Sequence, residues 1–215
     1  MAATELFRIP NLFSLARIAL IPFLGYFLAR TDKTSMIISV GLMAVAGITD
    51  GLDGYLARRL GQVSRLGIAL DPIADKIFAA ALIVLLIIFR GMPVWLGAVI
   101  VGRDLVILAA GSILLRGRDI SLPSNLTGKY AFFAIIMLLL SYTTRFQFGV
   151  ALLTWITLTL IFASLVNYGR LFFRLEANQP PPVFEDRPLY RWLRITVTTL
   201  LSVLWVVKWF LDVVL

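Results

Sequence analysis

Long apolar runs separated by short polar stretches dominate the chain. About 20 residues of α-helix span the roughly 30 Å hydrocarbon core of a bilayer. By that measure the sequence predicts apolar helices over residues 12–29, 35–58, 69–90, 93–115, 129–143, 148–172 and 192–215. The first six follow one another through short turns. We therefore expect an all-α, polytopic integral membrane protein, with a six-helix transmembrane bundle and an extra C-terminal hydrophobic helix.

The stretch NQPPPVFEDRP at residues 178–188 separates the last apolar run from the others. Consecutive prolines stop a helix because proline lacks a backbone N–H and its ring clashes with the preceding turn. We expect a membrane domain over residues 1–175, a cytoplasmic linker over residues 176–191 and a separate helix over residues 192–215.

Composition supports the membrane class and narrows the chemistry. Hydrophobic residues make up 60% of the 215 positions and charged residues only 15%, which is not the balance of a soluble domain. The chain has no cysteine and no histidine. Histidine-based acid–base catalysis, cysteine nucleophiles and the usual zinc sites are therefore excluded. A bound metal would have to accept oxygen ligands, as Mg²⁺, Mn²⁺ and Ca²⁺ do.

The net charge is +8, and most cations at the ends of the predicted helices fall on one side of the membrane. With the N-terminus inside, the inner cations are Arg8, Arg58, Arg59, Arg65, Arg116, Arg118, Lys129, Arg170, Arg174, Arg187, Arg191 and Arg194, and the outer ones are Arg30, Lys33, Arg90 and Arg145. This asymmetry predicts a cytoplasmic N-terminus and basic loops against anionic membrane lipids. We expect no nucleic-acid partner.

Four aspartates stand close together where two apolar runs meet: Asp50 and Asp53 at the end of one, Asp71 and Asp75 at the start of the next. A carboxylate in a membrane helix costs about 2.5–3.5 kcal/mol on insertion scales, so four of them need compensation. Positions three or four apart share a helix face, so each pair forms one carboxylate edge. One or two divalent cations would turn four repelling charges into a ligand shell on the cytoplasmic side.

Two other interpretations of the aspartates remain open. They could pair with Arg58, Arg59 and Arg65 in an ion network at the level of the headgroups. They could also belong to an ion- or proton-coupled transporter, although transporters place such acids near the middle of the bilayer.

The aspartates belong to a longer pattern: Asp50-x2-Asp53-Gly54-x2-Ala57-Arg58-x8-Gly67-x3-Asp71-x3-Asp75. This pattern resembles the signature of the CDP-alcohol phosphotransferase family at every fixed position, and the resemblance extends over residues 8–175. It implies a six-helix membrane fold, usually homodimeric, and an enzyme that moves a phosphoryl-alcohol group from a CDP-linked lipid to a hydroxyl and releases CMP.

The resemblance also implies roles for individual residues. Asp50, Asp53, Asp71 and Asp75 would bind Mg²⁺ or Mn²⁺, with two ions expected, and Asp75 would also be the general base toward the acceptor hydroxyl. The contacts to the CDP donor would come from Gly54, Ala57, Arg58 and Gly67, together with Asn11 and Arg17 of the first helix. For Arg17 a contact to one of the signature aspartates is a further possibility, and an arginine that only extends toward the headgroups is the alternative.

The run LDPIADK at residues 70–76 is most similar to the branch of phosphatidylglycerophosphate synthases and eukaryotic-type cardiolipin synthases. Arg103, Lys129 and Arg170 are candidates for binding a phosphate on the acceptor, whereas a local pair with Asp104 is the alternative for Arg103. Arg-Asp at residues 103–104 is common in the cardiolipin type, and Arg-Glu in the other. CDP-diacylglycerol is the expected donor. Glycerol 3-phosphate is the preferred acceptor, and phosphatidylglycerol or another CDP-alcohol reaction is the alternative.

Overall fold

The computed structural model describes residues 9–59, 65–114, 126–177 and 188–214. Within these ranges the side chains are described except at residues 9–13, 50–59, 65–73, 111–114, 176, 188–190, 193 and 214.

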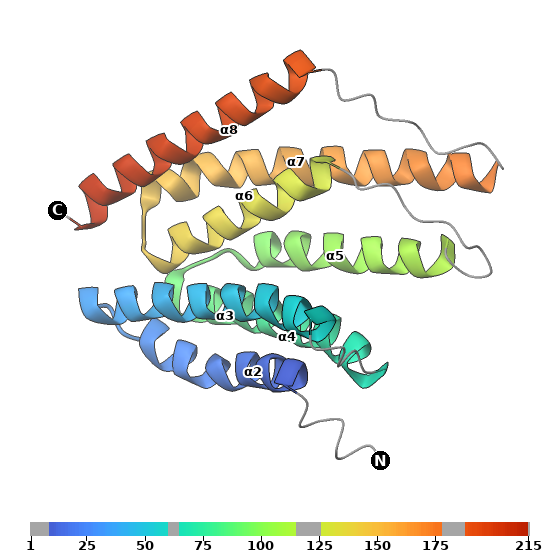
Figure 1. The fold of residues 1–215 in the computed structure, drawn as a ribbon. Helices are drawn as coiled ribbons and strands as arrows, with labels where there is room; N and C mark the ends of the chain where they lie inside the picture. The colour runs from blue at the N-terminus through green and yellow to red at the C-terminus, as the bar shows by residue number, and fades with distance from the viewer. Residues whose placement is uncertain (1–8, 60–64, 115–125, 178–187, 215) are drawn as a thin grey trace. The chain divides into compact units, whose positions relative to one another are not determined.

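Every predicted apolar run contains a helix (Figure 1). The helices are α2 (Ile9–Leu28), α3 (Lys33–Arg59), α4 (Arg65–Arg90), α5 (Val94–Leu114), α6 (Leu126–Thr143), α7 (Gln147–Glu176) and α8 (Pro188–Trp209), and α8 ends in a π-helical turn (Phe210–Val214). The described residues contain no strand, so the all-α prediction is confirmed. Three helical stretches are long and apolar enough to cross a membrane, namely Leu126–Thr143, Gln147–Leu175 and Arg194–Val213. The apolar stretches Ser14–Leu28 and Lys33–Thr49 are shorter.

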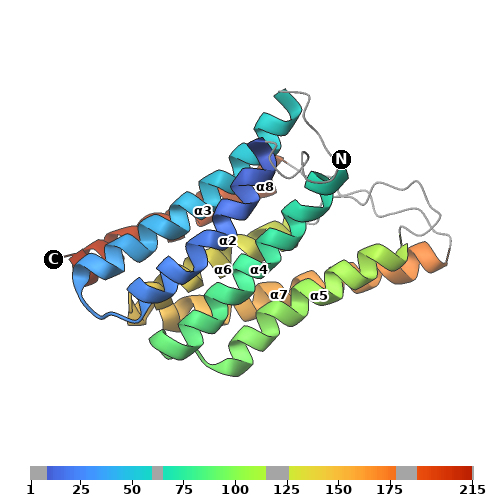
Figure 2. The same ribbon diagram turned by 90° about the horizontal axis from the view of Figure 1, so that it is seen from below.

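The chain divides into two compact units. Unit 1 comprises residues 1–97 and 142–144, and unit 2 comprises residues 98–141 and 145–215. In unit 1, α2 packs against both α3 and α4, and the three helices run side by side in Figure 2. Buried leucines of α2, Leu24 and Leu28, and of α4, Leu82 and Leu86, contribute to the core of this unit. Helix α2 is therefore the element that both aspartate-bearing helices share.

A side-chain cap fixes the start of α3. The backbone N–H and the hydroxyl of Ser35 both donate to the carboxylate of Asp32, each at 2.8 Å. Such a cap satisfies a backbone donor that has no partner within the helix. The same two hydrogen bonds, the backbone one first, lower the pKa of Asp32 below its ordinary value.

Helix α4 begins earlier than the sequence predicts. A start near residue 69 would place Pro72 in the first turn, where proline is favoured. The helix instead begins at Arg65, so Pro72 lies inside it, and that prediction is wrong. A proline at this position donates no hydrogen bond to the carbonyl four residues earlier. Asp71 and Asp75 consequently stand in the second and third turns of α4.

A tight corner between α6 and α7 holds α8 in unit 2. Phe146 precedes α7 and its backbone N–H donates to the carbonyl of Ser141 at 2.9 Å. The indole N–H of Trp205, on α8, donates to the Ser141 hydroxyl at 3.1 Å. The Trp205 ring also meets the Phe146 ring edge-on, with centroids 5.6 Å apart. A Cβ on Gly149 would overlap the Phe146 ring and the Ser141 hydroxyl.

We therefore expect Gly149→Ala to destabilise the protein by about 1–3 kcal/mol, the usual cost of overpacking a filled site. Gly169→Ala is the matched control, because it lies in the same helix and a Cβ there meets nothing within 4 Å. Unfolding of both variants in detergent, followed by circular dichroism, measures the difference. Equal stability of the two variants would contradict the tight corner.

Candidate functional site

The four signature aspartates lie on two helices of unit 1. Asp50 and Asp53 fall in the last turns of α3, and Asp71 and Asp75 fall within α4. Both helices are continuous through these positions, so the spacings of three and four residues put each pair on one helical face. The side chains of Asp50, Asp53 and Asp71 lie outside the described side chains.

The described part of this site is an ion pair between Arg17 and Asp75. Arg17 comes from α2 and is only 2% exposed, whereas the side chain of Asp75 on α4 is 41% exposed. The guanidinium therefore does not extend along the helix to the headgroups, as the alternative for Arg17 required. Ser14, one turn earlier on α2, is also buried. The structure thus joins two of the predicted site residues through the packing of α2 on α4, and leaves one face of the Asp75 carboxylate accessible.

The predicted contacts to the CDP donor lie mostly outside the described side chains. Asn11 is on α2, Gly54, Ala57 and Arg58 are on α3, and Gly67 is on α4, and only their helical backbone is described.

The carboxylates of the predicted site are ligands that suit a hard divalent cation. Carboxylate oxygens at helical spacings of three and four residues are ligands that Mg²⁺ and Mn²⁺ accept. Within the side chains that the structure describes, no group of three or more acidic residues forms a candidate metal site. The side chains of Asp50, Asp53 and Asp71 are not among the described ones.

A second polar cluster lies in unit 2 around Arg103 of α5. The Arg103 side chain is 10% exposed, and its Nη1 donates to Asp104 at 2.7 Å. Its Nη2 donates to the carbonyl of Gly128, on α6, at 3.4 Å. The buried Nε has no hydrogen-bond partner among the described residues. The local pair with Asp104 is therefore present, and it satisfies only part of the guanidinium.

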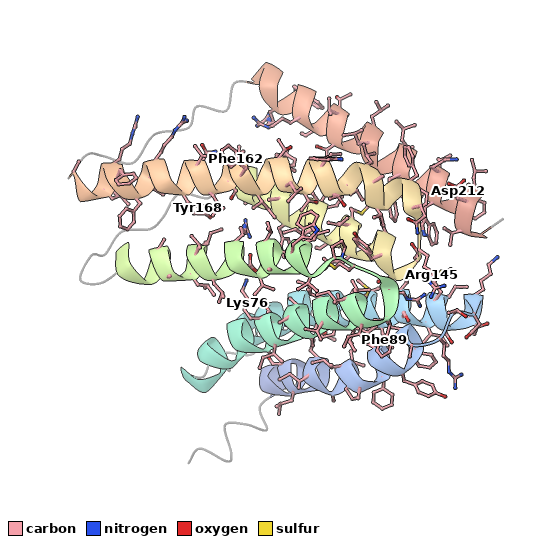
Figure 3. All side chains as sticks on the ribbon, turned by 180° about the vertical axis from the view of Figure 1, so that it is seen from behind. Lys76, Phe89, Arg145, Phe162, Tyr168 and Asp212 are labelled. Atoms are coloured by element: carbon pink, nitrogen blue, oxygen red, sulfur yellow. The ribbon has the colours of Figure 1, made fainter. Side chains whose placement is uncertain are left out.

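Gly128 of α6 lies beside side chains of both α5 and α7 in this cluster. A Cβ on Gly128 would lie 3.4 Å from Arg103 Nη2, 3.6 Å from the Ser164 hydroxyl and 3.7 Å from the Tyr168 hydroxyl. Ser164 is fully buried, and its hydroxyl has no partner among the described residues. Tyr168 extends from α7, as labelled in Figure 3. Arg103 and Ser164 thus bring two hydrogen-bonding groups with unused capacity to one glycine.

Ser164, Tyr168 and Gly128 are not among the site residues expected from the sequence. Their signal is present in the chain, because Ser164 and Tyr168 are four residues apart and so share a face of α7. The predicted cations Lys129 and Arg170 are exposed. Lys129 follows Gly128 by one residue, and Arg170 follows Tyr168 by two. The structure therefore brings Arg103 into a buried cluster and leaves the other two on the surface.

The chain is similar to one family of known proteins, and its relatives carry related names. The family model for CDP-alcohol phosphatidyltransferase matches residues 7–180. A probable CMP-forming cardiolipin synthase of Drosophila melanogaster is 40% identical over 120 residues, which are 55% of this chain and 35% of that protein. The human CMP-forming cardiolipin synthase is 43% identical over 123 residues, 57% of this chain and 39% of that protein.

A third relative is covered almost completely. The CDP-diacylglycerol–glycerol-3-phosphate 3-phosphatidyltransferase of Aquifex aeolicus is 32% identical over 178 residues, which are 78% of this chain and 97% of that protein. The chain spans little more than a third of the two animal proteins. On the match over residues 7–180 and the near-complete coverage of the Aquifex protein, the chain belongs to the CDP-alcohol phosphatidyltransferase family.

Proposed function

We propose that the chain transfers the phosphatidyl group of CDP-diacylglycerol to an acceptor hydroxyl and releases CMP. The observation that carries this proposal is the Arg17–Asp75 ion pair, because it joins the predicted base to a buried cation on a neighbouring helix. Family membership and relatives named as phosphatidyltransferases support this enzyme over a transporter. In an integral membrane family, the apolar helices α6 and α7 also suit a lipid donor.

Glycerol 3-phosphate is the acceptor that we propose. The Aquifex relative is named for that acceptor and is matched along 97% of its length. The buried Arg103 guanidinium and the Ser164 hydroxyl both have capacity for a further hydrogen bond. A phosphate monoester presents oxygens that a guanidinium binds strongly, and often by two parallel hydrogen bonds.

Phosphatidylglycerol is the second candidate acceptor. The residue types Arg-Asp at residues 103–104 favour it, as does the 43% identity with the human cardiolipin synthase. Both acceptors carry a phosphate and a free hydroxyl, so the same groups serve either one.

In the proposed reaction the acceptor hydroxyl oxygen attacks the phosphorus that bears the diacylglycerol. A new P–O bond forms to the acceptor, the P–O bond to CMP breaks, and CMP leaves. Asp75 accepts the proton of the attacking hydroxyl. Arg17 is a positioning residue, because its buried guanidinium fixes one side of the carboxylate and leaves the exposed side for the hydroxyl.

A divalent cation, Mg²⁺ or Mn²⁺, would be held by Asp50, Asp53, Asp71 and Asp75. When bound, it would neutralise the donor pyrophosphate and polarise the phosphorus under attack. The family depends generally on divalent metal ions, which supports this assignment. The homodimer, the cytoplasmic position of the site and the domain limits are further predictions from the sequence.

The first test is CMP release by detergent-purified protein given CDP-diacylglycerol, Mg²⁺ or Mn²⁺, and one acceptor at a time. We expect CMP with glycerol 3-phosphate, and loss of activity by about 10²-fold or more in Asp53→Asn and Asp71→Asn, since each removes a charged metal ligand. CMP with phosphatidylglycerol alone would establish the second candidate. No CMP with either acceptor, or full turnover in Asp71→Asn, would contradict the proposal.

A double-mutant cycle tests the role of Arg17. We expect Arg17→Gln to lower kcat by about 10–100-fold, because a positioned base contributes roughly 10²–10⁴-fold, with little change in the KM for CDP-diacylglycerol. If Arg17 acts through Asp75, adding Arg17→Gln to Asp75→Asn costs no further activity. Lys76→Gln is the control, because Lys76 is an exposed cation next to Asp75. Fully additive losses in the double variant would show that Arg17 does not act through Asp75.

Comparing the effects on the KM values of the two substrates tests the role of Arg103. We expect Arg103→Lys to raise the KM for glycerol 3-phosphate about tenfold, since a charge-assisted hydrogen bond contributes about 1.5–3 kcal/mol, and to leave the KM for CDP-diacylglycerol unchanged. Arg145→Lys is the control, because Arg145 is an exposed cation at the α6–α7 corner. Equal increases in both KM values would argue against an acceptor-binding role for Arg103.

A further inference from the structure

Gly128 leaves a small recess among three polar side chains of unit 2. The Cβ that this glycine lacks would lie 3.4–3.7 Å from Arg103 Nη2, the Ser164 hydroxyl and the Tyr168 hydroxyl. These are ordinary van der Waals distances, so the three groups border one methyl-sized space at nearly equal range. Arg103 comes from α5, and Ser164 and Tyr168 come from α7, where Figure 3 labels Tyr168. One cation and two hydroxyls therefore line the recess.

The guanidinium of Arg103 keeps hydrogen-bonding capacity at this recess. An arginine carries five N–H donors. Nη1 donates to Asp104 and Nη2 donates to the carbonyl of Gly128, whereas the buried Nε has no partner among the described residues. The pair with Asp104 offsets part of the positive charge but does not use up the donors. Arg103 can therefore donate to a further acceptor and keep both contacts.

Ser164 differs from two nearby hydroxyls of the same helix. Thr154 and Thr159 donate to carbonyls of α7 four residues earlier, at 2.7 Å and 2.9 Å. Such a bond to its own helix is a common way for a hydroxyl to be satisfied. The Ser164 hydroxyl is fully buried and has no partner among the described residues. Because an unpaired buried hydroxyl is costly, an oxygen atom placed at the recess would supply what it lacks.

The recess lies close to an exposed surface at the start of α6. Gly128 stands in the first turn of α6, where the backbone N–H groups have no partner within the helix and favour an anion. Asn167 of α7 is exposed and donates to the Thr127 hydroxyl at 2.8 Å. Lys129 is exposed as well. An anion that approaches from this side meets a second cation before it reaches Arg103.

We propose that Ser164 and Tyr168 select a phosphate monoester over a phosphate diester at this recess. The inference rests on the acceptor site proposed around Arg103. That guanidinium can meet the phosphate of either candidate acceptor, so the choice between them must come from the groups beside it. Selection of a monoester means that the site takes glycerol 3-phosphate in preference to phosphatidylglycerol.

The number of donors is the physical reason for this selection. A phosphate monoester presents three terminal oxygens and carries about −1.5 to −2 charges at neutral pH. A diester presents two terminal oxygens and one charge, and its second ester oxygen bears a carbon substituent. With donors on three sides, a diester turns that substituent toward one of them, and the fully buried Ser164 hydroxyl then stays unpaired. A site built of hydrogen-bond donors discriminates strongly against a ligand that leaves one unpaired.

An ordered water is the alternative occupant of the recess. A buried water makes two to four hydrogen bonds, so it would satisfy both Arg103 and Ser164. In that case the two hydroxyls would have no influence on which phosphate binds. The two occupants therefore predict different results when Ser164 loses its hydroxyl.

Isothermal titration calorimetry tests the selection without requiring turnover. Detergent-purified protein with Mg²⁺ is titrated with glycerol 3-phosphate or with its phosphate methyl ester, which is a diester without acyl chains. We expect the unaltered protein to bind the monoester at least about tenfold more tightly. Ser164→Ala should weaken binding of the monoester about tenfold or more, the contribution of a hydrogen bond to a charged group, and leave the diester nearly unchanged.

Thr157→Val is the control for Ser164→Ala. The Thr157 hydroxyl is also fully buried without a partner among the described residues, and it lies seven residues earlier on α7. Its removal should leave both affinities unchanged, because Thr157 does not border the recess.

Two further variants probe the recess itself. Gly128→Ala should fold, since its methyl group makes ordinary contacts, and should weaken the monoester at least as much as Ser164→Ala. Gly102→Ala is its control, because a Cβ beside Arg103 on α5 meets nothing within 4 Å. Tyr168→Phe should lower the preference for the monoester, whereas Tyr130→Phe, at a side chain that lines an apolar groove beside α8, should keep it. Circular dichroism checks that each variant is folded.

Equal affinity of the unaltered protein for the two esters, or no binding of either, would overturn this inference. So would a Ser164→Ala variant that weakens both esters to the same extent or neither of them, as a water-filled recess predicts. Each of these results can occur while CMP is released with glycerol 3-phosphate, so the proposed reaction would stand. Selective binding of the monoester without CMP release would support the phosphate site and contradict the reaction instead.

Discussion

The cost of placing charge among apolar helices is the constraint on which the described site depends. Arg17 is almost fully buried in unit 1, and a guanidinium in such surroundings needs a carboxylate close by. Asp75 supplies it from the neighbouring helix. Because α2 also packs against α3, the helix that carries Arg17 touches both helices that carry the signature. The ion pair therefore ties the position of Asp75 to the packing of all three helices.

Arg103 meets the same constraint in a different way. Its carboxylate is the next residue along the chain, and its second contact is a backbone carbonyl at the limit of hydrogen-bond length. Neither contact uses Nε, and the nearby Ser164 hydroxyl is also without a partner among the described residues. Buried polar groups are usually satisfied, so two orphaned groups beside one glycine favour a ligand as the missing partner. In the proposed reaction the Arg17–Asp75 pair would hold the general base in place, whereas the Arg103 cluster would suit reversible binding of a phosphate.

Hydrophobic spacing was enough to predict the helices, because bilayer thickness sets their length and their composition. It placed every helix to within a few residues. It missed the early start of α4, because proline is favoured in the first turn of a helix and α4 instead continues through Pro72. The spacing of the aspartates placed them in pairs on two helices. It left three alternatives open for Arg17, namely the donor phosphate, a signature aspartate and the headgroups, because a snorkelling arginine and a buried one have the same sequence pattern; the structure shows the aspartate, Asp75. Ser164 and Tyr168 were missed for a related reason: hydroxyls scattered through an apolar helix acquire meaning only when another helix brings Arg103 beside them.

The apolar composition of the C-terminal helix α8 does not by itself fix how this helix packs. Helix α8 lies beyond the residues that match the family, which end at residue 180, and its described polar link to α6 is the single hydrogen bond of Trp205. In water its apolar surface would drive it against α6 and α7, but in a bilayer lipid chains are as apolar as leucine, and that force is absent. Contact between these helices then depends on shape, hydrogen bonds and whatever fills the space between them. Besides Trp205, helix α8 offers Leu201 and the two small side chains Thr198 and Ser202 to the space beside α6 and α7. The same physics that makes α8 easy to insert therefore makes its packing dependent on the membrane around it.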